Sequence, residues 1–207
     1  MEFNDVIDRR HTVRSFKDID VSMEQIKRII DAGIKAPSNN HLREIEFIVI
    51  KDKERIKEVI KKIPKTQSPK RVEFIMNSWK LKDEVQIKMY QDSIPKQYSM
   101  LCDANVLLIP LFKNKKNILE PKSLSDLNGF ASMWCSIENI FLATTNENLG
   151  YALRIPFKNE IEYLNEVLEI PKDYVIPCYI AIGHKDDNEN IEQVKVNFED
   201  KIHFDRW

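Results

Sequence analysis

Apolar residues recur at helical spacing in four stretches of the chain. The stretches are bounded by residues that start or stop helices: Ser22 with Gln25 three positions later has the pattern of a capping box, Asp52 is an N-cap residue, and Pro37 follows the second stretch. The predicted helices cover residues 3–9, 23–35, 53–63 and 124–149. The last has about seven turns and is so apolar that we expect it to be central.

Three short runs are almost continuously apolar, as is typical of buried strands: 46–51, 104–112 and 176–184. Pro110 lacks a backbone N–H, so we expect its strand to lie near a sheet edge or to carry a bulge. The segment HFDRW at 203–207 is a candidate edge strand. Because helices and strands alternate without a regular crossover rhythm, the pattern predicts an α+β fold with a central sheet wrapped by helices.

The length and the composition predict one domain over residues 1–207. Four glycines and nine prolines leave no low-complexity linker along the chain. The stretch 64–100 is polar and lysine-rich with loosely helical spacing, so we expect a peripheral helical excursion that could form a lid.

The charge pattern and the apolar pattern exclude several classes of protein. The net charge is −1, whereas binding to a nucleic-acid backbone needs a basic domain or stripe. No apolar run approaches the roughly 18 to 20 residues that span a membrane. The start of the chain lacks the pattern of a secretory signal, so we expect a cytoplasmic protein. Three widely spaced cysteines favour neither disulfides nor a metal site.

A basic cluster interrupts this balanced charge at RRHTVRSF, where Arg9, Arg10, His11 and Arg14 lie close together. Taken alone, such a cluster is either a solvated surface or an anion site. Neither usual phosphate-binding loop is present, because the chain has no GxGxxG after a strand and no GxxxxGK[ST].

Four segments together form a recognisable pattern along the chain: RxTxRxF at 10–16, APSNN at 36–40, NLGYALRIP at 148–156 and LNEVLEIPKDYVIPCYIAIGH at 164–184. In this order and at these separations they resemble the FMN-dependent nitroreductase family over nearly the whole chain. The resemblance implies an α+β sandwich with a mainly antiparallel central sheet flanked by helices. It also implies an interlocked homodimer with FMN at the subunit interface.

The resemblance assigns the basic cluster to this cofactor. Arg10, His11 and Thr12 match the residues that contact the phosphate and ribityl chain of FMN, and Lys195 matches a basic residue of the same set. A phosphate of charge near −2 needs cations and donors held close together. Arg14 matches the cation beside the flavin N1 and C2 carbonyl, where reduction leaves negative charge.

Two further segments complete the implied flavin site. The first matches a loop that reaches the flavin of the partner subunit, and it comprises Pro37, Ser38, Asn39 and His41. The second matches backbone that runs along the flavin ring with one N–H directed at N5, and it comprises Leu153, Arg154 and Ile155. For the Arg154 side chain, the phosphate and a substrate are both open as partners.

One stretch departs from the family pattern. The usual PSxxNxQPWxF is PSNNHLREIEF here, so that His41 stands in place of an asparagine, Arg43 in place of a glutamine, and Glu44 and Ile45 in place of the Pro-Trp pair. His41 can still donate a hydrogen bond to flavin. The changes at Arg43 and Glu44 bear on the choice of substrate.

The resemblance implies ping-pong chemistry in which NADH or NADPH reduces FMN, and the flavin then reduces a small electron-poor acceptor such as a nitroaromatic or a quinone. The cofactor performs this reaction, so no catalytic side chain is expected. Two alternatives stay open. One is a flavoprotein of the same fold with different chemistry: reductive dehalogenation, dehydrogenation or flavin fragmentation. The other is a non-enzymatic binding module.

Overall fold

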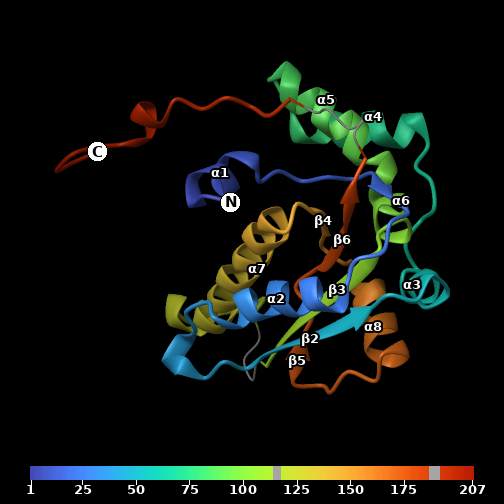
Figure 1. Ribbon diagram of the computed structural model, residues 1–207. Helices are drawn as coiled ribbons and strands as arrows, with labels where there is room; N and C mark the ends of the chain where they lie inside the picture. The colour runs from blue at the N-terminus through green and yellow to red at the C-terminus, as the bar shows by residue number, and fades with distance from the viewer. Residues whose placement is uncertain (114–117, 187–191) are drawn as a thin grey trace. The chain divides into compact units, whose positions relative to one another are not determined.

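The computed structural model describes residues 1–113, 118–186 and 192–207. The chain divides into two compact units. The first comprises Met1–Lys65 and Lys96–Glu189, and the second comprises Thr66–Pro95 and Asn190–Trp207. Figure 1 shows the elements of both units along the chain.

The first unit contains the sheet and most of the helices. Its helices are α1 (Phe3–Arg9), α2 (Met23–Ile34), α3 (Lys53–Val59), α6 (Ser99–Cys102), α7 (Asn128–Asn146) and α8 (Lys158–Val167). Its strands are β1 (Phe16–Lys17), β2 (Ile45–Ile50), β3 (Val106–Lys113), β4 (Gly150–Arg154), β5 (Tyr174–Val175) and β6 (Tyr179–Lys185). Short 3-10 turns lie at Asn39–His41, Pro95–Gln97 and Leu124–Leu127. No helix in the described part of the chain is long and apolar enough to cross a membrane.

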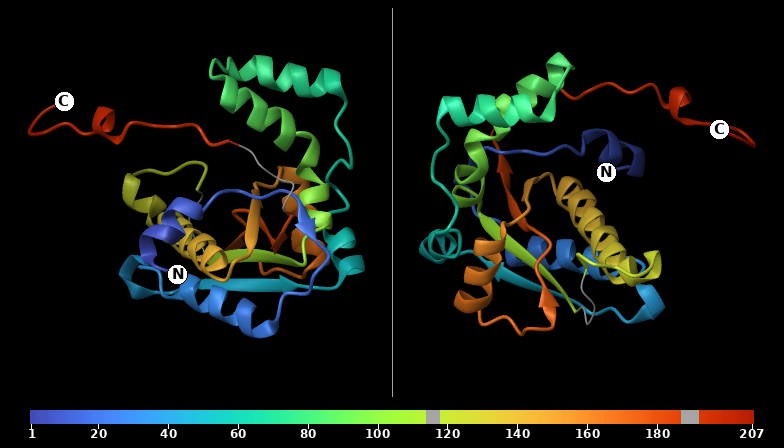
Figure 2. Two further views of the ribbon diagram at one scale, coloured as in Figure 1. Left: turned by 45° about the horizontal axis from the view of Figure 1, so that its top comes forward. Right: turned by 180° about the vertical axis from the view of Figure 1, so that it is seen from behind.

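The sheet has the order β1-β6-β3-β2, with β4 added to β6 and β5 added to β3. Each of these strand pairs is antiparallel. Helices cover both faces of the sheet, with α2 and α7 on one face and α3, α6 and α8 on the other (Figures 1 and 2). The α+β fold with a mainly antiparallel sheet is therefore confirmed.

The two layers of core explain why β3 is apolar from Val106 to Phe112. Side chains alternate between the two faces of a strand. Leu107, Ile109 and Leu111 pack in the cluster with α3, α6 and α8, whereas Val106 and Leu108 pack in the cluster with α2 and α7. Both faces of β3 are thus covered, and a polar residue at any of these positions would be buried.

Local capping fixes where the predicted helices begin. The Ser22 hydroxyl accepts a hydrogen bond from the Gln25 N–H at 3.2 Å, and the Gln25 side chain accepts one from the Ser22 N–H at 3.2 Å. The Asp52 carboxylate accepts from the Arg55 N–H at 2.7 Å. These side chains satisfy backbone donors that a helix leaves free in its first turn. The capping residues expected for α2 and α3 are confirmed.

The expectation that Pro110 lies near a sheet edge is wrong, because β3 lies between β2 and β6. The alternative expectation, a bulge, agrees with the pairing, because residues 109–111 of β3 lie opposite the four residues 176–179. The Lys113 N–H donates to the Glu44 carbonyl at 3.0 Å, so the odd-numbered residues of β3 bond toward β2 and Pro110 faces the opposite side. There it falls between Leu108, the last residue paired with β6, and Phe112, the first paired with β5. The missing N–H therefore removes no ladder hydrogen bond.

Two other expectations change in detail. HFDRW at 203–207 forms no strand, and Trp207 is 99% exposed, so no neighbour supplies the ladder that an edge strand needs. In α1 only Val6 of the predicted apolar face is buried, whereas Phe3 and Ile7 are exposed.

The second unit contains α4 (Pro69–Trp79) and α5 (Glu84–Ser93), which form a helical hairpin, and a 3-10 turn at Phe198–Lys201. Ser68 and Asp83 cap the two helices. The Trp79 ring packs edge-on against the Tyr90 ring, with centroids 4.7 Å apart. The helical character predicted for 64–100 is present, and its role as a lid stays a prediction.

Candidate functional site

Arg10 lies directly after α1 and reaches the buried end of β4. Its Nη1 donates to the Tyr151 phenol oxygen at 2.7 Å, and its Nε is 3.4 Å from the Glu138 carboxylate on α7. The Arg10 and Glu138 side chains are 36% and 50% exposed. One cation of the basic cluster is thus held at the surface by groups from two other elements.

Tyr151 is a rigid support for that cation. It is 2% exposed, and its ring stacks on Phe141 of α7 with centroids 3.9 Å apart and planes 3° from parallel. Burial raises the pKa of the Tyr151 phenol, and hydrogen bonds from Arg10 and Thr12 act against that rise. The phenol therefore stays protonated at neutral pH and contacts two residues that the resemblance assigns to FMN.

Backbone contacts also hold the residues that follow Arg10 against Tyr151. Thr12 forms a parallel bridge with Tyr151, and the Val13 N–H donates to the Tyr151 carbonyl at 2.7 Å. The His11 ring turns back toward α1, with Nδ1 2.9 Å from the Arg9 carbonyl oxygen. Arg14, half-buried, follows the buried Val13.

β4 offers a backbone edge beside these residues. It pairs with β6 along its length, but in the described residues its other side meets only the bridge at Thr12. Because the Tyr151 carbonyl faces Val13, backbone groups at alternate residues of β4 point away from β6. Leu153 therefore directs its N–H toward this open edge, about 7 Å along the strand from Tyr151. A planar ring with acceptor atoms could bind there.

The Arg154 side chain is paired with a carboxylate of the next helix. Its guanidinium forms a two-pronged ion pair with Glu160 of α8, in which Nη2 donates to Oε1 at 2.7 Å and Nη1 donates to Oε2. The two side chains are 5% and 1% exposed. Any contact of Arg154 with flavin thus comes from its backbone, and the neighbouring Ile155 is exposed.

The loop after α2 is held by the other end of α7. The Asn39 N–H donates to the Ser132 hydroxyl at 2.9 Å, and the Ser38 hydroxyl accepts from the Arg43 N–H at 3.2 Å. His41 adopts a positive φ of 54° and is exposed, as is Pro37. Ser132 precedes Glu138 by six positions, about 9 Å along a helix axis.

Within one chain, this loop is therefore anchored apart from the Arg10 residues. Its assignment to the flavin of a partner subunit stays a prediction. Lys195 lies in the second unit, in an exposed stretch without regular structure, and its assignment to the phosphate set also stays a prediction.

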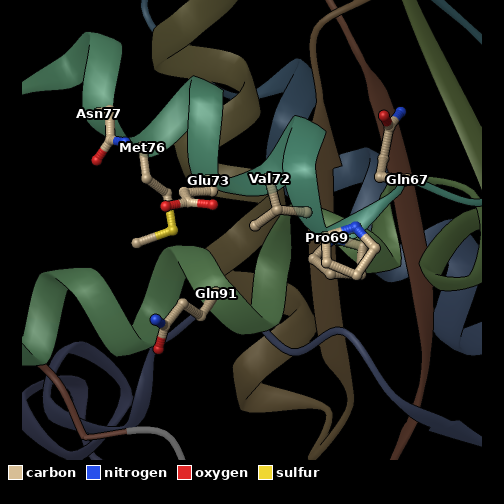
Figure 3. A pocket seen from close by; sticks show the side chains of 8 residues that line it. Gln67, Pro69, Val72, Glu73, Met76, Asn77 and Gln91 are labelled. Atoms are coloured by element: carbon tan, nitrogen blue, oxygen red, sulfur yellow. The ribbon is translucent and has the colours of Figure 1, made fainter.

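The second unit contains a cavity of about 540 Å³ between α4 and α5. Figure 3 shows the Met76 side chain on α4 directed toward the helix that carries Gln91. The lining mixes apolar groups, amides and one carboxylate: Gln67, Pro69, Val72, Glu73, Met76, Asn77, Gln91 and Pro95. Its size is within the usual range for small-molecule sites.

Comparison with known proteins identifies the family and supports the fold. A family profile described as "Nitroreductase family" matches residues 7–184. The chain belongs to the nitroreductase family. The match begins within α1 and ends within β6, so it covers Arg10, the loop after α2 and the open edge of β4.

Individual relatives are distant. An NADPH-dependent oxidoreductase of Staphylococcus aureus strain USA300 is 25% identical over 206 residues, which are 98% of this chain and 72% of the relative. Two solved structures share the fold. An FMN-dependent nitroreductase of Clostridium difficile R20291 has a TM-score of 0.69 and 20% identity, covering 98% of both chains. An iodotyrosine deiodinase bound to FMN and 3-iodo-L-tyrosine has a TM-score of 0.72 and 15% identity, covering 100% of both chains.

The residues of this chain fit a flavin nucleotide at the two points described. A partly exposed guanidinium on a rigid phenol suits a phosphate, and a backbone edge that no strand of the described residues covers suits a heterocyclic ring. Tyr151 and Glu138 were not among the residues predicted for the site. Tyr151 is 141 positions from Arg10, and no local spacing joins the two.

Proposed function

We propose that this member of the nitroreductase family is an FMN-dependent oxidoreductase that uses NADH or NADPH to reduce small electron-poor acceptors such as nitroaromatics or quinones. The observation that carries the proposal is Arg10 on its buried phenol beside the open edge of β4, in a chain of this family. The name of the Staphylococcus aureus relative, an NADPH-dependent oxidoreductase, supports the electron donor.

Each part of the site has a role in this proposal. The chemistry that FMN supplies is hydride acceptance from a nicotinamide and onward electron transfer. Arg10 and Thr12 would bind the phosphate and ribityl chain, and the Leu153 N–H would position the ring at the strand edge. The Arg14 guanidinium would stabilise negative charge on the reduced ring. Orientation and electrostatics come from the protein, and no side chain needs to transfer a proton.

We also propose that the protein acts as a homodimer. A hollow of about 340 Å³ lies between α1, α2 and α7, and its lining is mainly apolar: Met1, Phe3, Val6, Ala32, Asn139, Leu142, Ala143 and Asn146. Phe3 is 70% exposed on this face. A partner chain that covered this face could also bring its 37–41 loop to the flavin. Light scattering at several concentrations tests the dimer, and a monomer at all of them contradicts it.

Flavin retention tests the cofactor. Arg10→Ala removes the proposed phosphate ligand, whereas Arg206→Ala removes an exposed cation that lies outside the set. The first variant should purify with much less FMN than wild type, and the second with the same amount. Equal flavin content in the two variants would contradict the assignment, and a wild-type protein that stays colourless with excess FMN would refute the function.

A second candidate keeps FMN but changes the reaction to reductive dehalogenation, dehydrogenation or flavin fragmentation. It is supported by the departure at PSNNHLREIEF and by the fold shared with an iodotyrosine deiodinase. Steady-state assays with NADH or NADPH and either menadione or a nitroaromatic separate the candidates. FMN bound without turnover from either donor favours the second.

A further inference from the structure

Arg10 is held by two residues that have no assigned role, one neutral and one negative. We propose that Tyr151 and Glu138 together set the affinity of Arg10 for a phosphate ester: Tyr151 positions the guanidinium, and Glu138 competes with the phosphate for it. This inference rests on the proposed function, since it takes the flavin phosphate as the anion.

Tyr151 acts through its rigidity. Its backbone is paired with Ile182 of β6 on one side and bridged to Thr12 on the other, and its ring is stacked on Phe141. The phenol oxygen therefore stays in one place. A guanidinium has five N–H donors in one plane, so a bond from Nη1 to that oxygen restricts the orientation of the whole group. The donors that remain are held ready for an anion.

Tyr151 also ties the two proposed phosphate and ribityl ligands to each other. Its phenol accepts a hydrogen bond from Arg10, and its backbone is bridged to Thr12. A preorganised set of donors loses less conformational entropy on binding than a set of free side chains. Removal of the phenol oxygen should therefore weaken binding of the phosphate ester even though Arg10 and Thr12 are both still present.

Glu138 acts in the opposite direction through its charge. Its carboxylate lies 3.4 Å from the Arg10 Nε and is half exposed, so it can leave the guanidinium without losing solvation. A phosphate on Arg10 places two negative groups within one Debye length, about 8 Å at physiological ionic strength. The repulsion depends on the phosphate, so it should weaken binding of FMN and leave binding of riboflavin, which lacks the phosphate, unchanged.

Titration of flavin-free protein with FMN and with riboflavin, followed by quenching of flavin fluorescence, tests both roles. Glu138→Gln keeps the side-chain size and removes the charge, and Tyr151→Phe keeps the stack on Phe141 and removes the oxygen. Glu162→Gln is the matched control for the first, since Glu162 is an exposed helix carboxylate 3.9 Å from Lys158. Tyr163→Phe is the control for the second, since the Tyr163 phenol donates to the Glu58 carbonyl elsewhere on the first unit.

Glu138→Gln should lower the Kd for FMN about three- to ten-fold, and the gain should shrink as salt is added. Tyr151→Phe should raise the Kd for FMN about ten-fold, because it releases a positioned charged donor. The Kd for riboflavin should change less than two-fold in Glu138→Gln and in both controls, on the argument that only the ester is charged.

The outcomes separate this inference from the proposed function. A wild-type protein that binds neither flavin overturns the proposed function and the inference with it. A wild-type protein that binds FMN, with Glu138→Gln no tighter than Glu162→Gln, overturns the inference alone. Equal changes for FMN and riboflavin in Tyr151→Phe show a merely structural role for the phenol and overturn the positioning claim. Should Tyr151→Phe fail to fold, Glu138→Gln still tests whether Glu138 competes with the phosphate for Arg10, because Glu138 is on the surface of α7.

Discussion

Arg154 and Glu160 join the end of β4 to α8 through a buried ion pair. The Arg154 guanidinium lies over the Phe157 and Tyr179 rings, 5.4 and 5.8 Å from their centroids. The Glu160 carboxylate also accepts the Phe157 N–H at 3.2 Å, which caps α8. Glu160 thus neutralises a buried charge and satisfies a helix N-terminus at once.

Glu160→Gln removes the negative charge and leaves the rest of the side chain nearly unchanged. The Arg154 guanidinium then stays buried without a counter-charge. Removal of one partner from a buried ion pair costs about 3–5 kcal/mol of unfolding free energy, because desolvation of the remaining charge is no longer offset. The side chains are 5% and 1% exposed, so water cannot solvate the guanidinium without local opening.

Replacement of both partners should cost less than this single change. In the double variant Arg154→Met, Glu160→Met no charge is buried, and apolar side chains of similar length fill the space between Phe157 and Tyr179. Such replacements are often neutral in other proteins, and the lost helix cap adds about 1 kcal/mol. We therefore expect the double variant to be more stable than Glu160→Gln by about 2 kcal/mol or more.

Urea unfolding followed by far-UV circular dichroism measures these differences. Asp31→Asn is the control, because the Asp31 and Lys35 side chains are 59% and 68% exposed, and loss of an exposed pair costs less than about 1 kcal/mol. A double variant as unstable as Glu160→Gln refutes the argument that the unpaired charge is the source of the loss. So does a Glu160→Gln variant that unfolds at the same urea concentration as Asp31→Asn.

Two more changes test the packing and the surface electrostatics. Gly183→Ala should destabilise the protein by about 1–3 kcal/mol in the same urea assay, because overpacking forces neighbouring atoms to move. The new Cβ would lie 2.3 Å from the Asn105 amide oxygen. Gly129→Ala is the control and should leave the stability unchanged, because a Cβ there would have no atom within 4 Å. The hydrogen bond to Glu46 raises the pKa of Tyr174 from 10.0 to about 12, so the folded state holds this proton longer and stability should fall as the pH rises between these values. Ultraviolet titration should find several late phenols in wild type, because burial also raises the pKa of Tyr151 and of Tyr179. Glu46→Gln should return one of them, Tyr174, toward its ordinary midpoint, and an unchanged number of late phenols contradicts the cause.

Helix starts could be predicted from the sequence because the interactions that fix them are local. Ser22 and Gln25 are three residues apart and satisfy each other's backbone donors, whatever the rest of the fold does. The strand at 104–112 could be predicted for a different reason: a strand that is buried on both faces is almost continuously apolar, and that pattern is visible in the sequence. The place of Pro110 in the sheet could not, because it depends on which of two neighbouring strands its missing N–H would face.

The candidate site also contains residues that the sequence could predict and residues that it could not. The family pattern predicts Arg10 as a site residue from the residues around it, but its partners Tyr151 and Glu138 come from β4 and α7 and meet it only in the fold. The family pattern also does not predict the partner of the Arg154 side chain. The family pattern predicts that its backbone runs along the flavin, whereas its guanidinium donates to the Glu160 carboxylate on α8.

One feature of topology joins the two halves of the proposed flavin site. The N-terminal segment meets β4 at the Thr12 bridge and through the Val13 N–H, and then pairs with β6 as β1. The bridge at Thr12 sets Arg10 beside the Tyr151 phenol, and the departure to β6 leaves the edge of β4 open at Leu153. A segment that continued along β4 would have covered that edge with its own backbone bonds. The crossing from one strand to the other thus accounts for both the proposed anion site beside Tyr151 and the open N–H of Leu153, two residues that are about 7 Å apart along β4.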